Sequence, residues 1–355
     1  MTEFSILDCV IFDWRQRCSE NQPFADGTRR QSKIPQSRIE NPVHAISELS
    51  SVPGPVFLAI GVFDGVHLGH RAVIQRALDD ARTAGGSAVV ATFDPHPARI
   101  LRPGKAPRLL TSTAHKLRIV RGLGVDHLLV LPFTREFAAT DPADFVRALA
   151  SACSLREVCV GHEWAFGKNR AGNLALLDRL GHELGFDEVG VPAVRIGDEV
   201  VSSTVIRAAI ESGDLVKAAR LLGRDYSILG TVIKGAQLGR KLGFPTANLA
   251  AHNEQFPPNG VYAVDVHRNS DTLRGVANIG VRPTIENSTG ERLLEVHILD
   301  FDGDLYGEDI EVDFLSFLRP EQRFPNLDAL RAQIAADANA ARVSQTQQSK
   351  SPKVH

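Results

Sequence analysis

The sequence predicts two domains: an α/β domain with a doubly wound parallel sheet, followed by an all-β barrel that carries a C-terminal helix. Between Val56 and about Leu222, short apolar runs alternate with segments of helical period, which indicates parallel strands joined by crossover helices. After Leu222 the segments become short, β-branched and alternating, which is typical of a barrel. A chain of 355 residues also exceeds the usual size of one core.

The first domain opens with a β–α–β unit. The apolar run Val56–Ile60 predicts a buried parallel strand. From His70, apolar residues recur at helical spacing as far as Gly85 and Gly86, and Ser87 then begins the next expected strand, which ends at Thr92. Further strands are expected at 126–131 and 157–161, and helices at 141–152, with Pro142 at the first helical position, and at 174–184, closed by Gly185.

Five alternating segments and a last helix predict the barrel domain. The strands are expected at 226–233, 260–267, 273–279, 293–299 and 309–315, and the helix at 327–342. We place the α/β domain at 46–222 and the barrel domain at 227–343. Residues 1–45 fit neither pattern and are expected to be an extension, either disordered or wrongly started, with an ordered arm as the alternative. Residues 344–355 are expected to be a flexible tail.

The composition indicates an ordinary globular protein of the cytoplasm. Hydrophobic residues make up 43% and charged residues 23% of the chain, and the net charge is −2, so no field favours nucleic acid or an anionic membrane. No apolar run approaches the roughly 20 residues that span a bilayer. The four cysteines (Cys9, Cys18, Cys153 and Cys159) lack metal-ligand spacing, and no signal peptide is recognised. The sequence indicates no protein partner.

The most informative motif is GVFDGVHLGH at residues 61–70, where the first expected strand passes into a helix. Its glycines let the backbone approach a ligand, and the helix N-terminus offers N–H groups, which suits a triphosphate. His67 and His70 can donate hydrogen bonds to phosphate oxygens or to charge that develops in a transition state. Zinc is one alternative, although Gly69 breaks the HExxH pattern, and a purely conformational turn is the other.

A second candidate anion site is VSSTVIR at residues 201–207. Ser203 or Thr204 predicts a helix N-cap, and Arg207 follows one turn later, so hydroxyls, amides and a guanidinium would converge on one anion. Taken alone, the segment is simply a capped helix. The two histidines upstream favour the phosphate interpretation.

The expected barrel carries its own glycine-rich loop at residues 235–248. It is not a Walker A loop, because only three residues separate Gly235 from Gly239 and no Gly-Lys-Ser/Thr follows. Its backbone amides can still cradle phosphates, with Arg240 and Lys241 adding positive charge.

Two oxygen-bearing side chains follow this loop. Thr246 and Asn248 would lie on one face of an extended segment, an arrangement that suits Mg²⁺ shared with nucleotide phosphates. From the loop alone, a flexible hairpin with a polar strand start is an equal alternative.

The motif at 61–70 resembles the His-x-Gly-His nucleotidylyltransferase superfamily. Together with TFDPHP at 92–97 and the SSTVIR segment, it resembles the adenylyltransferase module of bacterial bifunctional riboflavin kinase/FAD synthetases. GRKLGFPTANL, GVANIGVRPT, LEVHILDFDGDLYG and FLRPEQRF resemble the riboflavin kinase module of the same family. The resemblance implies an FMN adenylyltransferase domain followed by a riboflavin kinase barrel, with ATP as co-substrate, Mg²⁺ as cofactor, and riboflavin, FMN and FAD as substrates and products.

The resemblance also implies roles for individual residues. His67 and His70 are expected to be catalytic in adenylyl transfer, and Glu295 to be the general base on the ribityl hydroxyl. Tyr262 and Phe317 are candidates either to flank the flavin ring or to belong to the core. The implied binding residues are Gly61, Phe63, Asp64, Gly69, Arg170, Ser203, Thr204 and Arg207 for ATP in the adenylyltransferase, Gly235, Gly239, Arg240, Lys241 and Gly243 for ATP in the kinase, and Thr246 and Asn248 for the metal.

One departure and two rival interpretations accompany the resemblance. Where the family has a shorter acid or amide followed by Phe, this chain has Glu163 and Trp164, and the extra methylene is expected to alter affinity rather than abolish activity. One rival is another nucleotidyltransferase, acting on a pantetheine or glycerol phosphate, and the other is a flavin- or RNA-binding barrel. The segment from Ile228 to Arg342 has 11 Lys and Arg against 16 Asp and Glu, which disfavours RNA.

Overall fold

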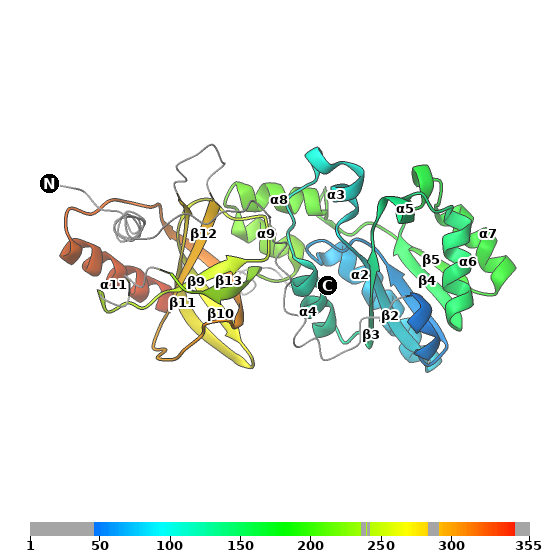
Figure 1. Cartoon of the computed structure of the whole chain (residues 1–355), viewed down its shortest axis with the longest axis horizontal. Coiled ribbons are helices and arrows are strands. Elements are labelled where there is room, and N and C mark those ends of the chain that lie inside the picture. Colours follow the sequence, from blue (N-terminus) through cyan, green and yellow to red (C-terminus); the bar gives the residue numbers. More distant parts are fainter. Residues whose placement is uncertain (1–45, 236–238, 240–241, 283–290, 345–355) are drawn as a thin grey trace, which may run out of the picture. The chain divides into compact units, whose positions relative to one another are not determined.

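The computed structural model of the chain describes residues 46–235, 239, 242–282 and 291–344 (Figure 1). These residues form two compact units, 46–206 and 207–344, and the division between them falls within helix α8 (Ser203–Glu211). The domain boundary at Leu222 that the sequence indicates stays a prediction. No helix in these ranges is long and apolar enough to cross a membrane. The expected N-terminal extension and nearly all of the expected tail lie outside the described residues.

The first unit is built on a parallel sheet, as predicted, and a fifth strand that was not expected completes it. Its strand order is β3-β2-β1-β4-β5, and all four neighbouring pairs are parallel. The order reverses at β1, so the crevice where such sheets bind ligands lies beyond the carboxyl ends of β1 and β4. The strands are β1 (Val56–Ile60), β2 (Ser87–Asp94), β3 (His127–Pro132), β4 (Leu155–Gly161) and β5 (Asp187–Val191).

Helices cover both faces of this sheet because alternate residues of its strands face opposite sides. Phe57 and Ala59 of β1 pack with helices α2 (Leu68–Ala84) and α4 (Thr113–Gly122). Leu58 and Ile60 pack on the other side with the remaining core helices, which are η1 (Ile46–Ser51), α6 (Pro142–Ala152) and α7 (Leu174–Leu184). The remaining short elements are α3 (Pro97–Leu101), η2 (Pro103–Lys105), α5 (Arg135–Ala138), η3 (Lys168–Arg170) and the hairpin of β6 (Arg195–Ile196) and β7 (Glu199–Val200).

The local signals in the sequence explain most helix ends. Asp141 caps α6 through hydrogen bonds that its carboxylate accepts from Ala143 and Asp144, and α7 ends at Gly185, whose φ of 83° is left-handed. The sequence predicts that the first long helix, α2, begins at His70. It begins at Leu68, because His67 is its N-cap.

The second unit contains the closed antiparallel barrel that the sequence predicts. Its strand order is β10-β11-β12-β9-β8-β13. The sixth strand, β9, was not expected, because its sequence ANLAA is rich in alanine rather than in β-branched residues. The barrel strands are β8 (Tyr226–Ile233), β9 (Ala247–Ala251), β10 (Gly260–Arg268), β11 (Asp271–Arg282), β12 (Glu291–Ile298) and β13 (Asp309–Arg319), preceded by α9 (Leu215–Leu222).

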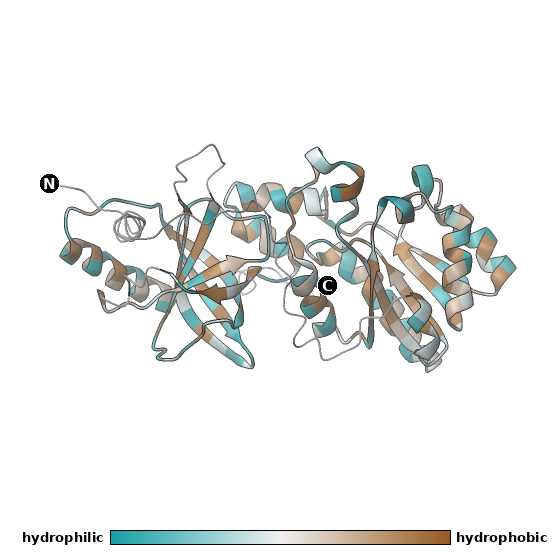
Figure 2. Ribbon diagram, viewed as in Figure 1, coloured by the Kyte–Doolittle hydropathy of each residue, from teal (hydrophilic) through white to brown (hydrophobic). Residues whose placement is uncertain are grey.

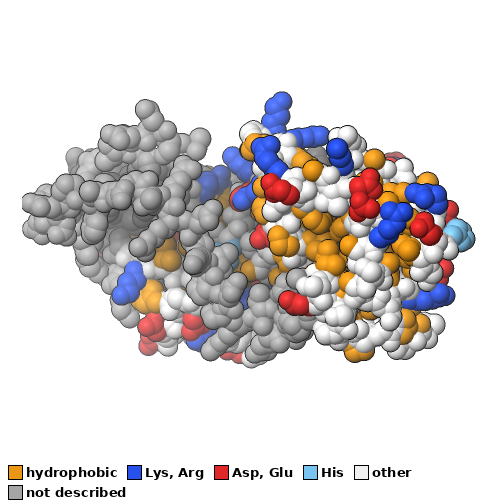
Figure 3. Space-filling model, turned by 45° about the vertical axis from the view of Figure 1, so that its right-hand side comes forward, with side chains coloured by type: hydrophobic (Ala, Val, Ile, Leu, Met, Phe, Trp, Pro, Cys, Tyr) orange, Lys and Arg blue, Asp and Glu red, His pale blue; other side chains and the backbone are white. Residues whose placement is uncertain are grey.

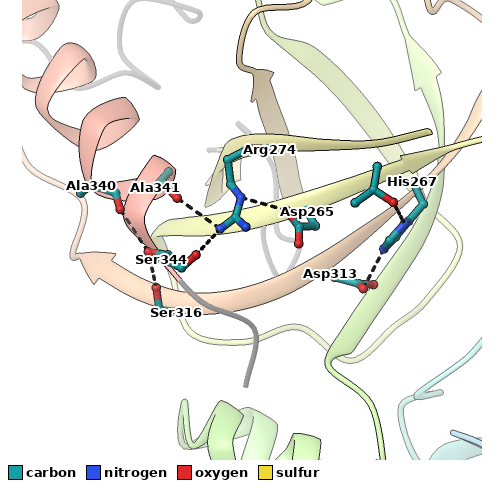
Figure 4. A network of polar contacts seen from close by, with 9 residues as sticks. Asp265, His267, Arg274, Asp313, Ser316, Ala340, Ala341 and Ser344 are labelled. Carbon is teal, nitrogen blue, oxygen red and sulfur yellow. Dashed lines mark hydrogen bonds and ion pairs between the residues drawn. The ribbon is translucent and has the colours of Figure 1, made fainter. Parts of the chain in front are cut away.

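Helix α11 (Leu327–Val343) packs on the outside of the barrel against β10, β11 and β13. A buried bidentate ion pair fixes it, in which Arg319 of β13 donates to both carboxylate oxygens of Asp337 at 2.8–3.1 Å. Arg274 of β11 also donates to the carbonyls of Ala341 and Ser344 at the end of the helix (Figure 4). Hydrophobic residues concentrate on the strands of both units, and the helices alternate between polar and apolar faces (Figure 2).

Figure 3 shows both basic and acidic side chains on the described surface. Basic side chains gather along the upper edge of this view, basic and acidic side chains alternate toward the right, and apolar side chains lie in the middle. The net charge of the whole chain is −2.

The polar network in Figure 4 predicts a pH dependence of barrel stability. His267 contacts Asp313 through Nε2 at 2.8 Å and Thr272 through Nδ1 at 3.0 Å. The hydrogen bond with Asp313 raises the pKa of His267, although burial opposes it. The stabilisation by protonated His267 is therefore fully present below about pH 6.5 and is lost as the pH rises through the higher folded-state pKa. Burial raises the pKa of Asp313 as well, so this carboxyl loses its proton at a higher pH than usual.

We expect the His267→Gln variant to lack this dependence. The difference in unfolding free energy between the wild type and the variant should shrink as the pH rises above about 6.5. Urea unfolding followed by the near-UV signal of tyrosine measures it, because all three tyrosines lie in the second unit. A difference that stays constant between acidic and alkaline buffers would contradict the expectation.

Candidate active sites

The turn after β1 holds a strained backbone within a buried environment. Phe63 and Val66 have φ values of 51° and 41°, which side-chain-bearing residues rarely adopt, and both are at most 2% exposed. The carboxylate of Asp64 accepts hydrogen bonds from the backbone N–H groups of Leu110 (3.2 Å) and Thr111 (3.0 Å). Asp64, predicted to bind ATP, therefore fixes the turn with its carboxylate, and a direct contact with ATP stays a prediction.

The two histidines of the motif are brought together at the N-terminus of α2. Nδ1 of His67 accepts a hydrogen bond from the backbone N–H of His70 at 3.3 Å, and the two imidazole rings stack with centroids 3.5 Å apart. A nitrogen that accepts carries no proton, so the proton of neutral His67 is on Nε2. The helix dipole and two closely stacked imidazoles give a site that favours an anion.

Two glycines of the motif allow this packing. A Cβ at Gly69 would lie 3.2 Å from the ring of His67, and one at Gly61 would lie 2.7 Å from the ring of Phe63. A side chain at either position would displace a ring of the motif. Gly61, Phe63 and Gly69 are therefore placed to shape the turn, while their contact with ATP stays a prediction.

The zinc alternative gains no support. The one group of three His, Cys, Asp or Glu side chains that lies close enough to hold an ion, within the ranges the structure describes, is Asp80, Glu157 and Cys159. It includes neither motif histidine. The Cys159 thiol donates to Glu157 at 3.0 Å, and Arg76 pairs with Asp80.

Helix α8 reaches the turn through its first residue. The Ser203 hydroxyl donates to the backbone carbonyl of Asp64 at 2.9 Å. The prediction that Ser203 or Thr204 caps the helix is wrong, because the Ser202 hydroxyl accepts from the N–H of Val205 and α8 begins one residue later. Thr204 is exposed, and Arg207 follows in the same helix, just past the division between the units.

The loop that follows β4 lies at the carboxyl end of this strand, which pairs with β1 in the sheet. Arg170 is exposed in η3, with a left-handed φ of 58°. Trp164 stacks on Phe166, with ring centroids 4.2 Å apart and planes at 17°, and both pack against the core. Glu163, the departure from the family pattern, is exposed. Trp164 is thus held by its neighbours, and Glu163 has room for its extra methylene.

Sequence reasoning missed one charged residue that the structure places beneath the motif. The Lys116 side chain of α4 is 4% exposed and donates to the Val62 carbonyl (2.7 Å) and to the Thr92 hydroxyl (3.0 Å). Burial lowers the pKa of Lys116 to about 8, against the opposing effect of Asp64 and Asp94. Only burial distinguishes this lysine, so no sequence pattern identified it.

In the second unit, Glu295 lies in a row of polar side chains across three barrel strands. It is opposite Asn278 of β11 and Asn248 of β9, and directly opposite residues share one face of a sheet. Glu295 and Asn278 are at most 8% exposed, although both are polar. Glu321 shares a hydrogen bond with Asn278, and burial raises the pKa of Glu321. The row therefore concentrates buried carboxyl and amide groups beside the glycine-rich loop.

The glycine-rich loop packs closely on the proposed metal ligands. A Cβ at Gly235 would lie 2.2 Å from the Asn248 amide, and one at Gly239 would lie 3.2 Å from the Thr246 hydroxyl. Gly243 has a left-handed φ of 87°. Arg240 and Lys241 lie outside the described residues. Neutral oxygens of Thr246 and Asn248 under a glycine cradle fit a hard cation such as Mg²⁺.

A cavity of about 410 Å³ adjoins this loop. Its size is within the range of small-molecule sites. Thr246 lies in its wall, together with apolar side chains of the barrel and two acids. Its lining residues are Val232, Pro245, Thr246, Ala247, Val296, Ile298, Phe301, Asp302, Gly303, Asp304, Leu305 and Tyr306.

The two flavin-flanking candidates have different environments. Tyr262 is 1% exposed, its hydroxyl donates to the Pro258 carbonyl at 2.7 Å, and its ring packs edge-on against Phe314, so it belongs to the core. Phe317 is 48% exposed and remains available to a ligand.

Comparison with known proteins agrees with this architecture. A family model described as FAD synthetase matches residues 50–205, and one described as riboflavin kinase matches residues 222–345. The bifunctional riboflavin kinase/FMN adenylyltransferase of Escherichia coli (strain K12) is 40% identical over 303 residues, covering 84% of this chain and 96% of the relative. The protein of the same name from Pseudomonas fluorescens is 40% identical over 284 residues, covering 80% and 91%.

A solved structure is similar over most of the chain. It is described as a macrolide-efflux protein from Streptococcus pneumoniae and has a TM-score of 0.69 at 30% identity, covering 82% of this chain and 96% of that one. The two matched modules define a two-module transferase that uses nucleotides. The chain belongs to the family of bifunctional riboflavin kinase/FMN adenylyltransferases. The match of both modules confirms the family predicted from the motifs and leaves the two rival interpretations without support.

Proposed function

We propose that this chain phosphorylates riboflavin to FMN with one ATP and then adenylylates FMN to FAD with a second ATP, releasing pyrophosphate. The observation that carries the proposal is the identity of 40% to a bifunctional relative over 96% of its length, with both modules matched. The stacked histidines in one unit and the buried Glu295 in the other give each module a candidate reaction centre.

In the first unit, the phosphate of FMN attacks the α-phosphorus of ATP and pyrophosphate leaves. Nε2–H of His67 and the ring of His70 hydrogen-bond the reacting phosphates and stabilise the charge that develops on them. The N-terminus of α2 faces the same anion. Ser203, Thr204, Arg207 and Arg170 hold the remaining phosphates, while Asp64 and Phe63 keep the turn in place. No covalent intermediate is needed, because positioning and electrostatics suffice.

In the second unit, Glu295 accepts the proton of the ribityl 5′-hydroxyl as the oxygen attacks the γ-phosphorus of ATP, and ADP leaves. The cavity beside Thr246 holds the nucleotide, with Val232, Val296 and Ile298 as apolar contacts for the base. Gly235, Gly239, Arg240, Lys241 and Gly243 surround its phosphates. Thr246 and Asn248 would hold Mg²⁺, which offsets phosphate charge when bound.

The working environment follows from the same proposal. The enzyme acts in the cytoplasm, and its partners are flavins and ATP, with no nucleic acid, membrane or protein partner required. The near-neutral net charge supports this view, because it gives no field for anionic polymers or surfaces.

Separate assays of the two half-reactions test the proposal. Purified protein is incubated either with FMN and ATP or with riboflavin and ATP, with and without a chelator of Mg²⁺. We expect FAD and pyrophosphate in the first reaction, FMN in the second, and loss of both when Mg²⁺ is removed. If one product does not form although Mg²⁺ is present, the corresponding activity is contradicted. If both reactions proceed at the full rate in the chelator, the proposed requirement for Mg²⁺ is contradicted.

A further inference from the structure

The turn that opens the histidine motif is held from beneath by a buried ammonium. Lys116 Nζ donates to the carbonyl of Val62 at 2.7 Å, and the Thr92 hydroxyl, which Lys116 also contacts, donates to the same carbonyl at 3.0 Å. Lysine is rarely buried so completely unless it is paired. Two donors thus converge on the carbonyl at which the chain leaves the sheet.

The segment from Leu110 to Lys116 holds this turn at Val62, Asp64 and Gly65, the last through the Gly65 N–H, which donates to the Thr111 hydroxyl at 3.0 Å. The amides of Leu110 and Thr111 bind the Asp64 carboxylate, and Lys116 binds the Val62 carbonyl two residues earlier. The strained residue Phe63 lies between Val62 and Asp64, and the strained residue Val66 follows them. A strained backbone persists only where its surroundings fix it, and here the hydrogen bonds to Val62 and Asp64 fix the turn that leads to His67.

We propose that Lys116 is a positioning residue for adenylyl transfer, whose buried ammonium holds the Val62 carbonyl and thereby sets His67 and His70 against the reacting phosphates. This inference rests on the proposed function of the first unit. Lys116 lies beneath the turn and does not touch substrate, so its effect reaches the reaction through the two histidines.

The charge of the Lys116 side chain predicts a pH dependence of the rate of FAD formation. A purely structural role of Lys116 would not produce this dependence. Burial lowers the pKa of Lys116 to about 8, and Asp64, in the turn, and Asp94, at the end of β2, are the charged groups that act against this shift. As the pH rises through about 8, the ammonium is lost and the hold on the turn weakens. The unfolded state keeps its proton to about pH 10.4, so folding stability rises over the same interval. Activity and stability therefore change in opposite directions.

Three variants of the full chain test the proposal. Lys116→Met keeps the length of the side chain and removes the charge, and Lys116→Arg keeps a charge that does not titrate. Arg118→Met removes an exposed cation from the same helix and is the matched control. Each protein is assayed for FAD formation from FMN and ATP between pH 7 and pH 10, with riboflavin phosphorylation by the same molecules as an internal reference.

We expect Lys116→Met to lower kcat for FAD formation by about 10- to 100-fold, with a smaller change in KM. Lys116→Arg should restore part of that activity and should lack the decline that the wild type shows above about pH 8. Arg118→Met should match the wild type, and all proteins should keep the kinase activity.

Two results would overturn the assignment: an unchanged kcat in Lys116→Met, or a wild-type profile that declines no more steeply than that of Lys116→Arg. If Lys116→Met does not fold, the pH profiles of FAD formation by the wild type and by Lys116→Arg still test the proposal. A wild type that forms no FAD from FMN at any pH overturns the proposed function of the first unit, and this inference with it.

Discussion

Replacing His70 by alanine is expected to lower the rate of FAD formation by about 10²- to 10³-fold, the cost of removing one donor aimed at developing charge. His70 lies in the first turn of α2, stacked on His67, where we propose that the helix N-terminus and both imidazoles bind the reacting phosphates. The substitution also removes the edge-on contact with Phe63, whose ring lies 5.4 Å away. The riboflavin kinase rate should not change, because Glu295 and its neighbours lie in the other unit.

The measurement is the initial rate of FAD and pyrophosphate release from FMN and ATP. His182→Ala is the matched control, because His182 is an 84% exposed histidine on α7 of the same unit. Adenylyl transfer that survives in His70→Ala would show that the reaction centre lies elsewhere. Simultaneous loss of the kinase activity would indicate misfolding rather than a local effect.

The second large effect is expected in Glu295→Gln, which should lower kcat for riboflavin phosphorylation by about 10²- to 10⁴-fold. Glutamine has nearly the same shape, so it fills the same 6% exposed position between Asn278 and Asn248. It cannot accept the ribityl proton. Conversion of supplied FMN to FAD should continue at the wild-type rate.

The rate of FMN formation from riboflavin and ATP checks this expectation. Glu254→Gln, at an exposed position of the same unit, is the matched control. Glu321→Gln tests the neighbouring carboxyl, whose pKa burial raises and which bonds to Asn278. A larger loss in Glu321→Gln than in Glu295→Gln would transfer the role of base to Glu321.

The sequence predicted those elements whose signals are local. Asp141 with Pro142, and Gly185 after an amphipathic run, define helix ends through their own hydrogen bonds and φ angles, and both ends were predicted correctly. The strand β5 was missed because DEVGV has neither an apolar run nor alternation, and pairing with β4 creates it. Helix α4 was missed because its buried face carries His115 and Lys116, which hides the apolar period.

The candidate sites show the same limit. The adjacency of His67 and His70 followed from a motif, and the structure adds their stacking and the N-cap role of His67. The cap of α8 was misplaced because residues 202–204 are all hydroxyl-bearing, and only the backbone geometry selects Ser202. Lys116 escaped notice because its chemistry depends on burial and on Val62, which is 54 residues away in the sequence.

The central claim is that one chain carries both reactions. Its most direct test is to incubate the purified wild type with riboflavin, ATP and Mg²⁺ and to resolve the flavins by chromatography over time. FMN should rise first and FAD should follow as FMN is consumed. Riboflavin that remains unchanged would contradict the kinase assignment, and FMN that accumulates without FAD would contradict the adenylyltransferase assignment.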